Sequence, residues 1–160
     1  VVREPVGILP PEYQARPFSR DALLAAVMPS LAERLPRPLP LEALAEQPFI
    51  ALRDPQGMGL GHRLWQLCQG AGFTPRIELR VNNATSILGL VAAGFGVSLM
   101  PAVLRRIGMA GVALLELEGS EAHTGLAIVH RPADISPLKL RFLAHLPPGG
   151  EGFPQPEVIV

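Results

Sequence analysis

The run from Val81 to Leu104, VNNATSILGLVAAGFGVSLMPAVL, limits the possible folds more than any other part of the chain. A polar cluster opens it, an apolar stretch rich in small residues follows, and a glycine-x-glycine turn precedes the end. This order predicts a helix over Thr85–Gly94 and then a short buried strand over Val97–Met100. Polar side chains at the start of a helix, on an apolar support, favour a binding domain over an enzyme.

The uncharged stretch within this run, Ile87–Leu104, is not predicted to cross a membrane. A membrane-spanning helix needs roughly 20 consecutive apolar residues, and glycine and proline interrupt this stretch before that length is reached. A buried helix followed by a buried strand explains it better. Charged residues at Arg3 and Glu4 also argue against a signal peptide at the start of the chain, so we expect a cytoplasmic protein without a membrane partner.

The composition fits a packed domain that does not contact nucleic acid by itself. The chain has 160 residues, of which 48% are hydrophobic, which is enough for one domain or two small lobes with a core. Its formal net charge is +0 and no basic stripe is present, so nucleic-acid binding by these residues is not expected. The single cysteine, Cys68, excludes an internal disulfide framework and suits a reducing compartment.

Strand-like and helix-like patterns alternate along the chain, which predicts an α/β fold with a mainly parallel sheet. The stretch from Pro10 to Pro17 is expected to be a loop. The predicted strands are Asp21–Met28, Phe49–Leu52, Arg76–Val81, Val97–Met100, Val112–Leu117 and Gly125–His130. The predicted helical segments are Ser30–Leu35, Leu41–Ala45, His62–Ala71, Thr85–Gly94, Ala102–Gly108 and Pro137–Leu146, the last capped by Ser136. The tail from Pro147 onward is predicted to be loosely held.

Most candidate chemistry in the chain has a simpler structural explanation. Gly57, Gly59 and Gly61 precede a helix, but their Gly-x-Gly-x-Gly spacing is not that of the dinucleotide-binding motif. None of the four histidines stands at metal-ligand spacing from another ligand. No serine lies in a Gly-x-Ser-x-Gly turn. We therefore predict no cofactor, no metal site and no catalytic group.

The polar cluster Asn82-Asn83-Ala84-Thr85-Ser86 is the exception. It lies at the carboxyl end of a predicted parallel strand and at the start of a helix, and ligands of open α/β sheets bind in that crevice. The free N–H groups of a helix start favour an anion such as a carboxylate. Simple helix capping by Asn82 or Asn83 is the alternative, and both roles are compatible.

Several segments, in order, resemble the effector-binding domain of LysR-type transcriptional regulators. The run TSILGLVAAGFGVSLMP carries the resemblance most clearly, and LPLEALAEQPFI and LWQLCQGAGFTPRIELRV precede it in the expected positions. The segment GLAIVHRPADISPLKLRFLAHL is similar to the family's returning strand and last helix, and VVREP is similar to the end of an earlier strand. Together these segments cover nearly the whole chain up to Leu146.

The resemblance implies a periplasmic-binding-protein-like fold of type 2, with two Rossmann-like subdomains and an effector cleft between them. Subdomain two would span 26–126, and residues 1–25 and 127–160 would form part of subdomain one. The first half of subdomain one and the family's helix-turn-helix region have no counterpart in these 160 residues, so the chain is expected to begin within a domain. DNA contact is therefore expected only through a region absent from this chain.

The resemblance also implies a set of effector-binding residues. Asn82 and Asn83 stand where the family places effector contacts, and Arg3 stands at a contact position after the earlier strand. Thr85 is added here because it is close to them. An arginine and a helix start facing one cleft would favour a small carboxylate, and the family implies a homo-oligomer, either a dimer or a tetramer. A solute-binding protein fragment with no DNA role is the alternative, and a small α/β enzyme is a third possibility.

Overall fold

One long strand organises the structure. This strand is β2, Gln14–Val27. The structure is a computed structural model that describes residues 1–55, 57–119 and 121–146. The other elements, in chain order, are β1 (Val2–Arg3), α1 (Pro29–Ala32), η1 (Leu41–Leu44), β3 (Pro48–Leu52), α2 (Gly59–Gly70), β4 (Arg76–Val81), α3 (Ala84–Ala92), β5 (Ser98–Pro101), η2 (Ala102–Ile107), β6 (Ala113–Glu116), β7 (His123–His130) and α4 (Pro137–Ala144).

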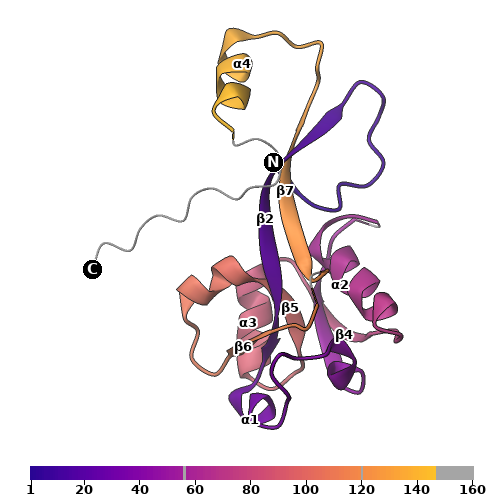
Figure 1. Ribbon diagram of the computed structural model, residues 1–160, viewed down its shortest axis with the longest axis vertical. Helices are drawn as coiled ribbons and strands as arrows, with labels where there is room; N and C mark the ends of the chain where they lie inside the picture. Colours follow the sequence, from indigo (N-terminus) through magenta and orange to yellow (C-terminus); the bar gives the residue numbers. More distant parts are fainter. Residues whose placement is uncertain (56, 120, 147–160) are drawn as a thin grey trace, which may run out of the picture.

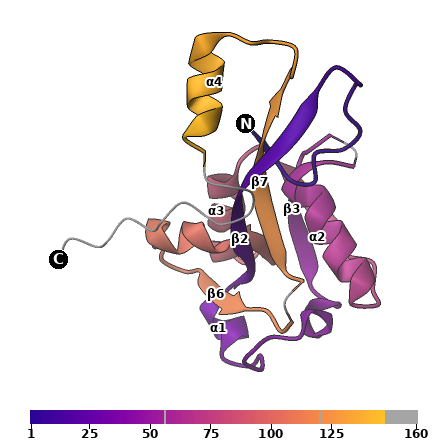
Figure 2. The same ribbon diagram turned by 45° about the horizontal axis from the view of Figure 1, so that its top comes forward.

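The two halves of β2 have different neighbours. Its first part pairs antiparallel with β7, from Gln14 opposite His130 to Ala22 opposite His123. Its last part is buried and pairs antiparallel with both β5 and β6. Figures 1 and 2 show β2 and β7 as a ribbon that rises from the lower layer of strands and helices toward α4.

A parallel pair, β3 and β4, extends the lower sheet beyond β5. Phe49 of β3 forms a parallel bridge with Val97, where the Ile50 N–H donates to the Val97 carbonyl over 2.8 Å. Helices α2 and α3 pack against this sheet through two apolar clusters. Leu64 and Cys68 of α2 belong to one cluster, whereas Leu60 of α2 joins the buried leucine, isoleucine and valine of α3 in the other.

The prediction of a mainly parallel sheet is therefore wrong around β2. The strands β3, β4 and β5 run parallel, as their helical connections require, but β2 runs antiparallel to each of its three partners. The predicted loop over Pro10–Pro17 is also wrong from Gln14 onward. Pro17 is tolerated because the β2–β7 register shifts between Pro17 and Ser19, where a missing N–H costs little.

A bulge in β4 changes which face its side chains occupy. Phe49 lies opposite Ile77, but the next residue, Ile50, lies opposite Leu79, so β4 holds one extra residue at this point. Ile77 packs with the cluster that contains Leu64 and Cys68 of α2, whereas Leu79 packs with the cluster that contains the α3 side chains.

The helix α4 is attached to the β2–β7 ribbon through few contacts. The Arg16 guanidinium donates to the Leu143 carbonyl over 2.8 Å, and Leu146 packs in a small cluster with Phe18 and Ile128. The predicted cap is present, since the Ser136 hydroxyl accepts the Lys139 N–H. The predicted loose tail from Pro147 lies outside the described residues.

Candidate functional site at the strand ends

Three helical segments begin at the same edge of the lower sheet. β3, β4 and β5 run parallel and lead into α2, α3 and η2, so the three connections meet at the carboxyl ends of the strands. The Arg53 N–H donates to the Val81 carbonyl over 2.8 Å, which joins the first two connections. We call this region the strand-end edge; it comprises Asp54, Asn82, Asn83 and Val103.

Each helical segment at the strand-end edge donates an N–H group to a side chain of the chain itself. The Gly61 N–H of α2 donates to Asp54 Oδ2 over 2.7 Å, and the Ser86 N–H of α3 donates to Asn83 Oδ1 over 2.8 Å. The Val103 N–H of η2 donates to Asp21 Oδ2 over 3.0 Å, from the neighbouring strand β2. Two of the three acceptors are carboxylates, which suit the positive end of a helix.

Arg3 contributes the cation of this region. β1 places it opposite Leu126 of β7, where its side chain is half-buried. Burial lowers the pKa of the Arg3 guanidinium, and the Asp21 and Asp54 carboxylates oppose that shift. A guanidinium remains charged even so, so Arg3 lies in the electrostatic field of the two carboxylates that cap α2 and η2.

The four sequence-predicted site residues differ in their local contacts. Asn83 is the N-cap of α3, as the capping interpretation predicts. Asn82 and Thr85 are exposed, and neither side chain has a hydrogen-bond partner among the described residues. No hydrogen bond joins Arg3 to any of the other three within that part of the chain.

Sequence reasoning missed Asp21 and Asp54. Asp54 gives no local signal, because the N-cap position of α2 is Met58 and Asp54 accepts the Gly61 N–H from outside the helix. Asp21 gives none either, since it caps a segment 82 residues further along the chain.

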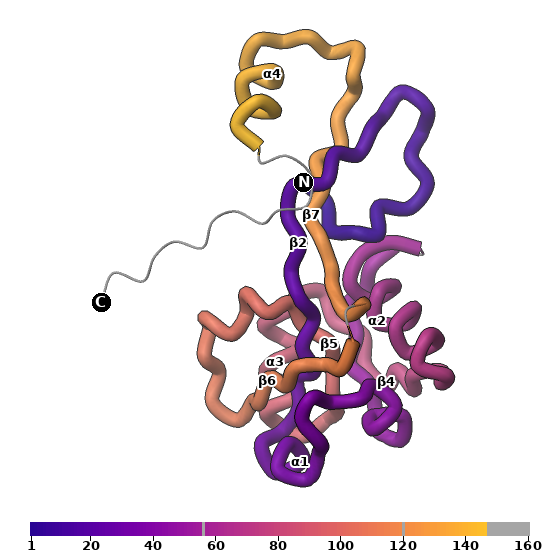
Figure 3. Tube along the Cα trace, viewed as in Figure 1, coloured from indigo at the N-terminus to yellow at the C-terminus, as the bar shows by residue number. Residues whose placement is uncertain are grey.

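The glycines around the start of α2 allow a turn of the backbone and a close approach to β3. Gly57 and Gly59 have positive φ angles, of 76° and 69°. A Cβ at Gly61 would lie 2.6 Å from the Leu52 carbonyl oxygen of β3, so only glycine allows this approach. The Gly59 N–H donates to the Pro5 carbonyl over 3.0 Å, and Figure 3 shows the loop after β1 lying against this start of α2.

The described residues hold no gathering of three or more histidine, cysteine, aspartate or glutamate side chains that could bind a metal ion. Cys68 is buried, and burial raises the pKa of its thiol to about 12, which makes it a structural rather than a reactive thiol. In the same part of the chain, no helix combines the length and apolar character needed to cross a bilayer.

A family model described as the LysR substrate binding domain matches residues 1–148. The chain belongs to this family. The uncharacterized HTH-type transcriptional regulator YcgK of Bacillus subtilis is 28% identical over 126 residues, which cover 78% of this chain and 38% of that protein. The malonate utilization transcriptional regulator of Klebsiella pneumoniae is 33% identical over 129 residues, which cover 77% of this chain and 40% of that protein. The chain thus spans less than half of these relatives.

Solved structures agree on the fold. The LysR family transcriptional regulator CbnR superposes with a TM-score of 0.76 at 22% identity, covering 86% of this chain and 48% of that one. The BenM effector binding domain with its effector benzoate gives a TM-score of 0.69 at 24% identity, covering 82% of this chain and 60% of that one. The prediction of an α/β, periplasmic-binding-protein-like fold of type 2 is confirmed. The named relatives are transcriptional regulators, which supports the prediction of a non-enzymatic domain.

Proposed function

We propose that this chain is the ligand-sensing regulatory domain of a LysR-type transcriptional regulator, and that its effector binds at the strand-end edge. The observation that carries the proposal is the convergence of three helix starts and one half-buried arginine at a single edge of the sheet. Ligands of open α/β sheets bind at such an edge. Arg3, Asn82, Asn83 and Thr85 are the proposed contacts.

The exposed amide of Asn82 and the hydroxyl of Thr85 have no partner among the described residues, so both are available to a ligand. Asn83 already uses its side-chain oxygen as a cap, which leaves its NH₂ group as a donor. Arg3 supplies a charge that matches a carboxylate. We therefore propose a small carboxylate as the effector, in line with the benzoate and malonate named for two of the matching proteins.

We also propose the subdomain division that the resemblance implies. Residues 26–126 would form subdomain two, and residues 1–25 and 127–160 would contribute to subdomain one. The separation of the Phe18 cluster from the two larger clusters of the lower layer supports this boundary. Effector binding between the subdomains would change their angle and shift the populations of two conformations.

The proposal includes a homo-oligomer, either a dimer or a tetramer, in the cytoplasm, with DNA contacted by a helix-turn-helix region outside these 160 residues. The likeness to CbnR, a LysR family transcriptional regulator whose full-length structure is also known with its target DNA, is in line with this role. A solute-binding protein with no DNA role is not favoured, because the matching relatives are transcriptional regulators.

Isothermal titration of the chain with a panel of small carboxylates tests the proposed site. We expect at least one compound to bind, and Asn82→Ala and Arg3→Gln to weaken its binding about tenfold or more. Gln14→Ala, which removes an exposed amide from β2, is the matched control. Equal affinity in the wild-type, Asn82→Ala and Arg3→Gln proteins would overturn the assignment.

A further inference from the structure

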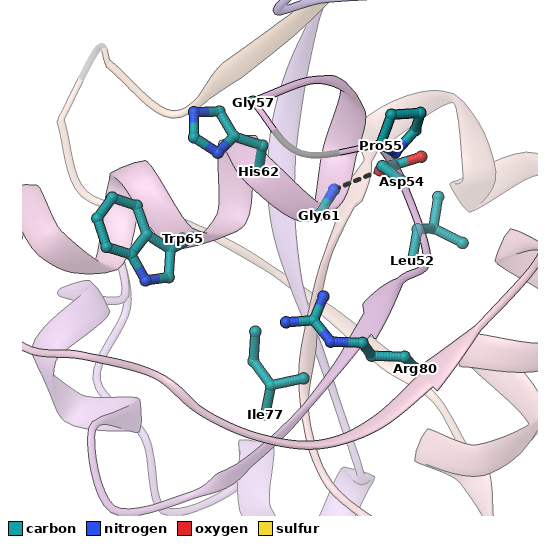
Figure 4. Close-up of a pocket in the computed structure, with 9 residues that line it drawn as sticks. All are labelled: Leu52, Asp54, Pro55, Gly57, Gly61, His62, Trp65, Ile77 and Arg80. Atoms are coloured by element: carbon teal, nitrogen blue, oxygen red, sulfur yellow. Dashed lines mark hydrogen bonds between the residues drawn. The ribbon is translucent and has the colours of Figure 1, made fainter.

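A pocket of about 470 Å³ lies between the first half of α2 and the edge strand β4. Asp54, Pro55 and Gly57, between β3 and α2, line one side of it. Figure 4 shows the lining side chains, which come from β3 and its loop, from α2 and from β4. They are Leu52, Asp54, Pro55, Gly57, Gly61, His62, Trp65, Ile77 and Arg80.

The bulge in β4 directs Arg80 into this pocket. Ile77 packs with the cluster of Leu64 and Cys68 and lines the pocket beside α2, whereas Leu79 packs with the cluster of the α3 side chains, because the extra residue between them interrupts the alternation. Regular alternation after Leu79 returns Arg80 to the α2 side. In Figure 4 the Arg80 guanidinium points into the space between Ile77 and α2. Among the described residues it has no hydrogen-bond or ion-pair partner, although it is a strong donor of five N–H groups.

The walls around this guanidinium are largely apolar. Leu52 and Ile77 line the sheet side, and Trp65 of α2 is 42% exposed on the opposite side. The rings of His62 and Trp65 stack at 6.1 Å with an interplanar angle of 14°. An exposed tryptophan next to aliphatic side chains offers a flat surface to a planar apolar group.

Asp54 limits the charge that this pocket accepts. Its carboxylate already receives the Gly61 N–H over 2.7 Å and stays at the pocket wall as a fixed negative charge. A ligand with one carboxylate can pair with Arg80, whereas a second carboxylate on the ligand would approach Asp54 and be repelled.

We propose that this pocket, the Arg80 pocket, is a second ligand site that binds an aromatic monocarboxylate. The ligand carboxylate pairs with the Arg80 guanidinium, and its ring packs between Trp65 and Ile77. The pocket shares Asp54 with the strand-end edge. Its proposed ligand contacts, Arg80, Trp65 and Ile77, are not among the proposed effector contacts, so the proposal goes beyond the proposed function and does not depend on it.

Trp65 is the only tryptophan of the chain, so its fluorescence reports binding directly. We expect benzoate to change the Trp65 emission saturably with a dissociation constant in the millimolar range, and succinate, a dicarboxylate, to bind at least tenfold more weakly. Arg80→Gln is expected to weaken benzoate binding about tenfold or more. Arg76→Gln is the matched control, because Arg76 is an exposed arginine on the same strand that pairs instead with Glu78 at 3.3 Å.

Three results would overturn the proposal: no saturable change up to about 20 mM benzoate, equal affinity in the wild-type and Arg80→Gln proteins, or equal weakening by Arg76→Gln and Arg80→Gln. The last result would show that the positive charge of β4 in general attracts benzoate, and not Arg80 in its pocket. Asn82→Ala separates this proposal from the first, since it leaves the Trp65 response unchanged whether or not an effector binds at the strand-end edge.

Discussion

Asn83 allows the capping role and the effector role at the strand-end edge to be measured separately. Its side-chain oxygen accepts the Ser86 N–H over 2.8 Å, and the group is exposed to solvent. Replacing an N-cap asparagine by alanine costs about 1 kcal/mol. For a domain of this size we expect Asn83→Ala to lower the unfolding temperature by roughly 2–4 °C per kcal/mol lost.

Asn83→Ser keeps an oxygen in the capping position but removes the NH₂ group proposed to face the effector. We expect this variant to unfold within about 0.5 kcal/mol of the wild type, because serine caps about as well as asparagine. Its effector affinity should nevertheless fall. Asn82→Ala, which removes no described hydrogen bond, should leave the unfolding temperature unchanged and weaken effector binding.

Thermal and denaturant unfolding followed by circular dichroism measure the stability changes, and titration calorimetry measures the affinities. The capping argument fails if Asn83→Ala is as stable as the wild type, or if Asn83→Ser is as unstable as Asn83→Ala. The effector argument fails if Asn83→Ser binds like the wild type, because the remaining role of the residue would then be capping alone.

Three further predictions concern packing, an α2 contact and pH. Gly61→Ala should lose about 1–3 kcal/mol of unfolding free energy, because its Cβ would meet a β3 carbonyl oxygen at 2.6 Å. Gly70→Ala in the same helix has open space and should gain up to about 1 kcal/mol. Urea unfolding compares the two variants, and equal effects would contradict the close-approach argument. Arg63→Ala should lose about 1–2 kcal/mol of unfolding free energy, because the Arg63 guanidinium donates to two backbone carbonyls at the start of β7. Amide hydrogen exchange should rise first at the start of β7, and unchanged exchange at that segment would refute the prediction. Burial raises the pKa of the Cys68 thiol from its ordinary 9.0 to about 12 in the folded protein. The contribution of the protonated thiol to stability is therefore complete below pH 9.0 and is lost as the pH rises through about 12. Cys68→Ala should show a shallower alkaline loss of stability in unfolding titrations, and parallel pH profiles would exclude the thiol as a cause.

Sequence patterns predict the elements whose signals are local. The alternation of Arg76–Val81 gives β4 with the observed bounds, and Ser136 followed by proline gives the start of α4. The start of α2 is three residues earlier than the predicted His62, because three glycines of low helix propensity obscure it. The Asp54 cap, which is visible only in three dimensions, holds that first turn.

The elements that local sequence patterns do not predict are those that depend on pairing between distant segments of the chain. Polar and proline residues before Phe18 are typical of a loop, yet β7 pairs with them as a strand more than one hundred residues away in the chain. The same distinction between local and long-range signals applies to the candidate site. Asn83 is predictable as a cap from its neighbours, whereas the approach of Arg3 and Asp21 to the strand-end edge depends on β1 and β2 crossing the molecule.

The bulge in β4 is a position at which the strand can lose one residue while every later side chain keeps its face of the sheet. Losing a residue from a regular strand moves every later side chain to the opposite face. Losing Glu78, the extra residue between the Ile77 and Leu79 pairs, would instead restore simple alternation and leave Leu79 toward α3 and Arg80 toward α2. A variant of this chain without Glu78 should therefore keep both the core and the orientation of Arg80.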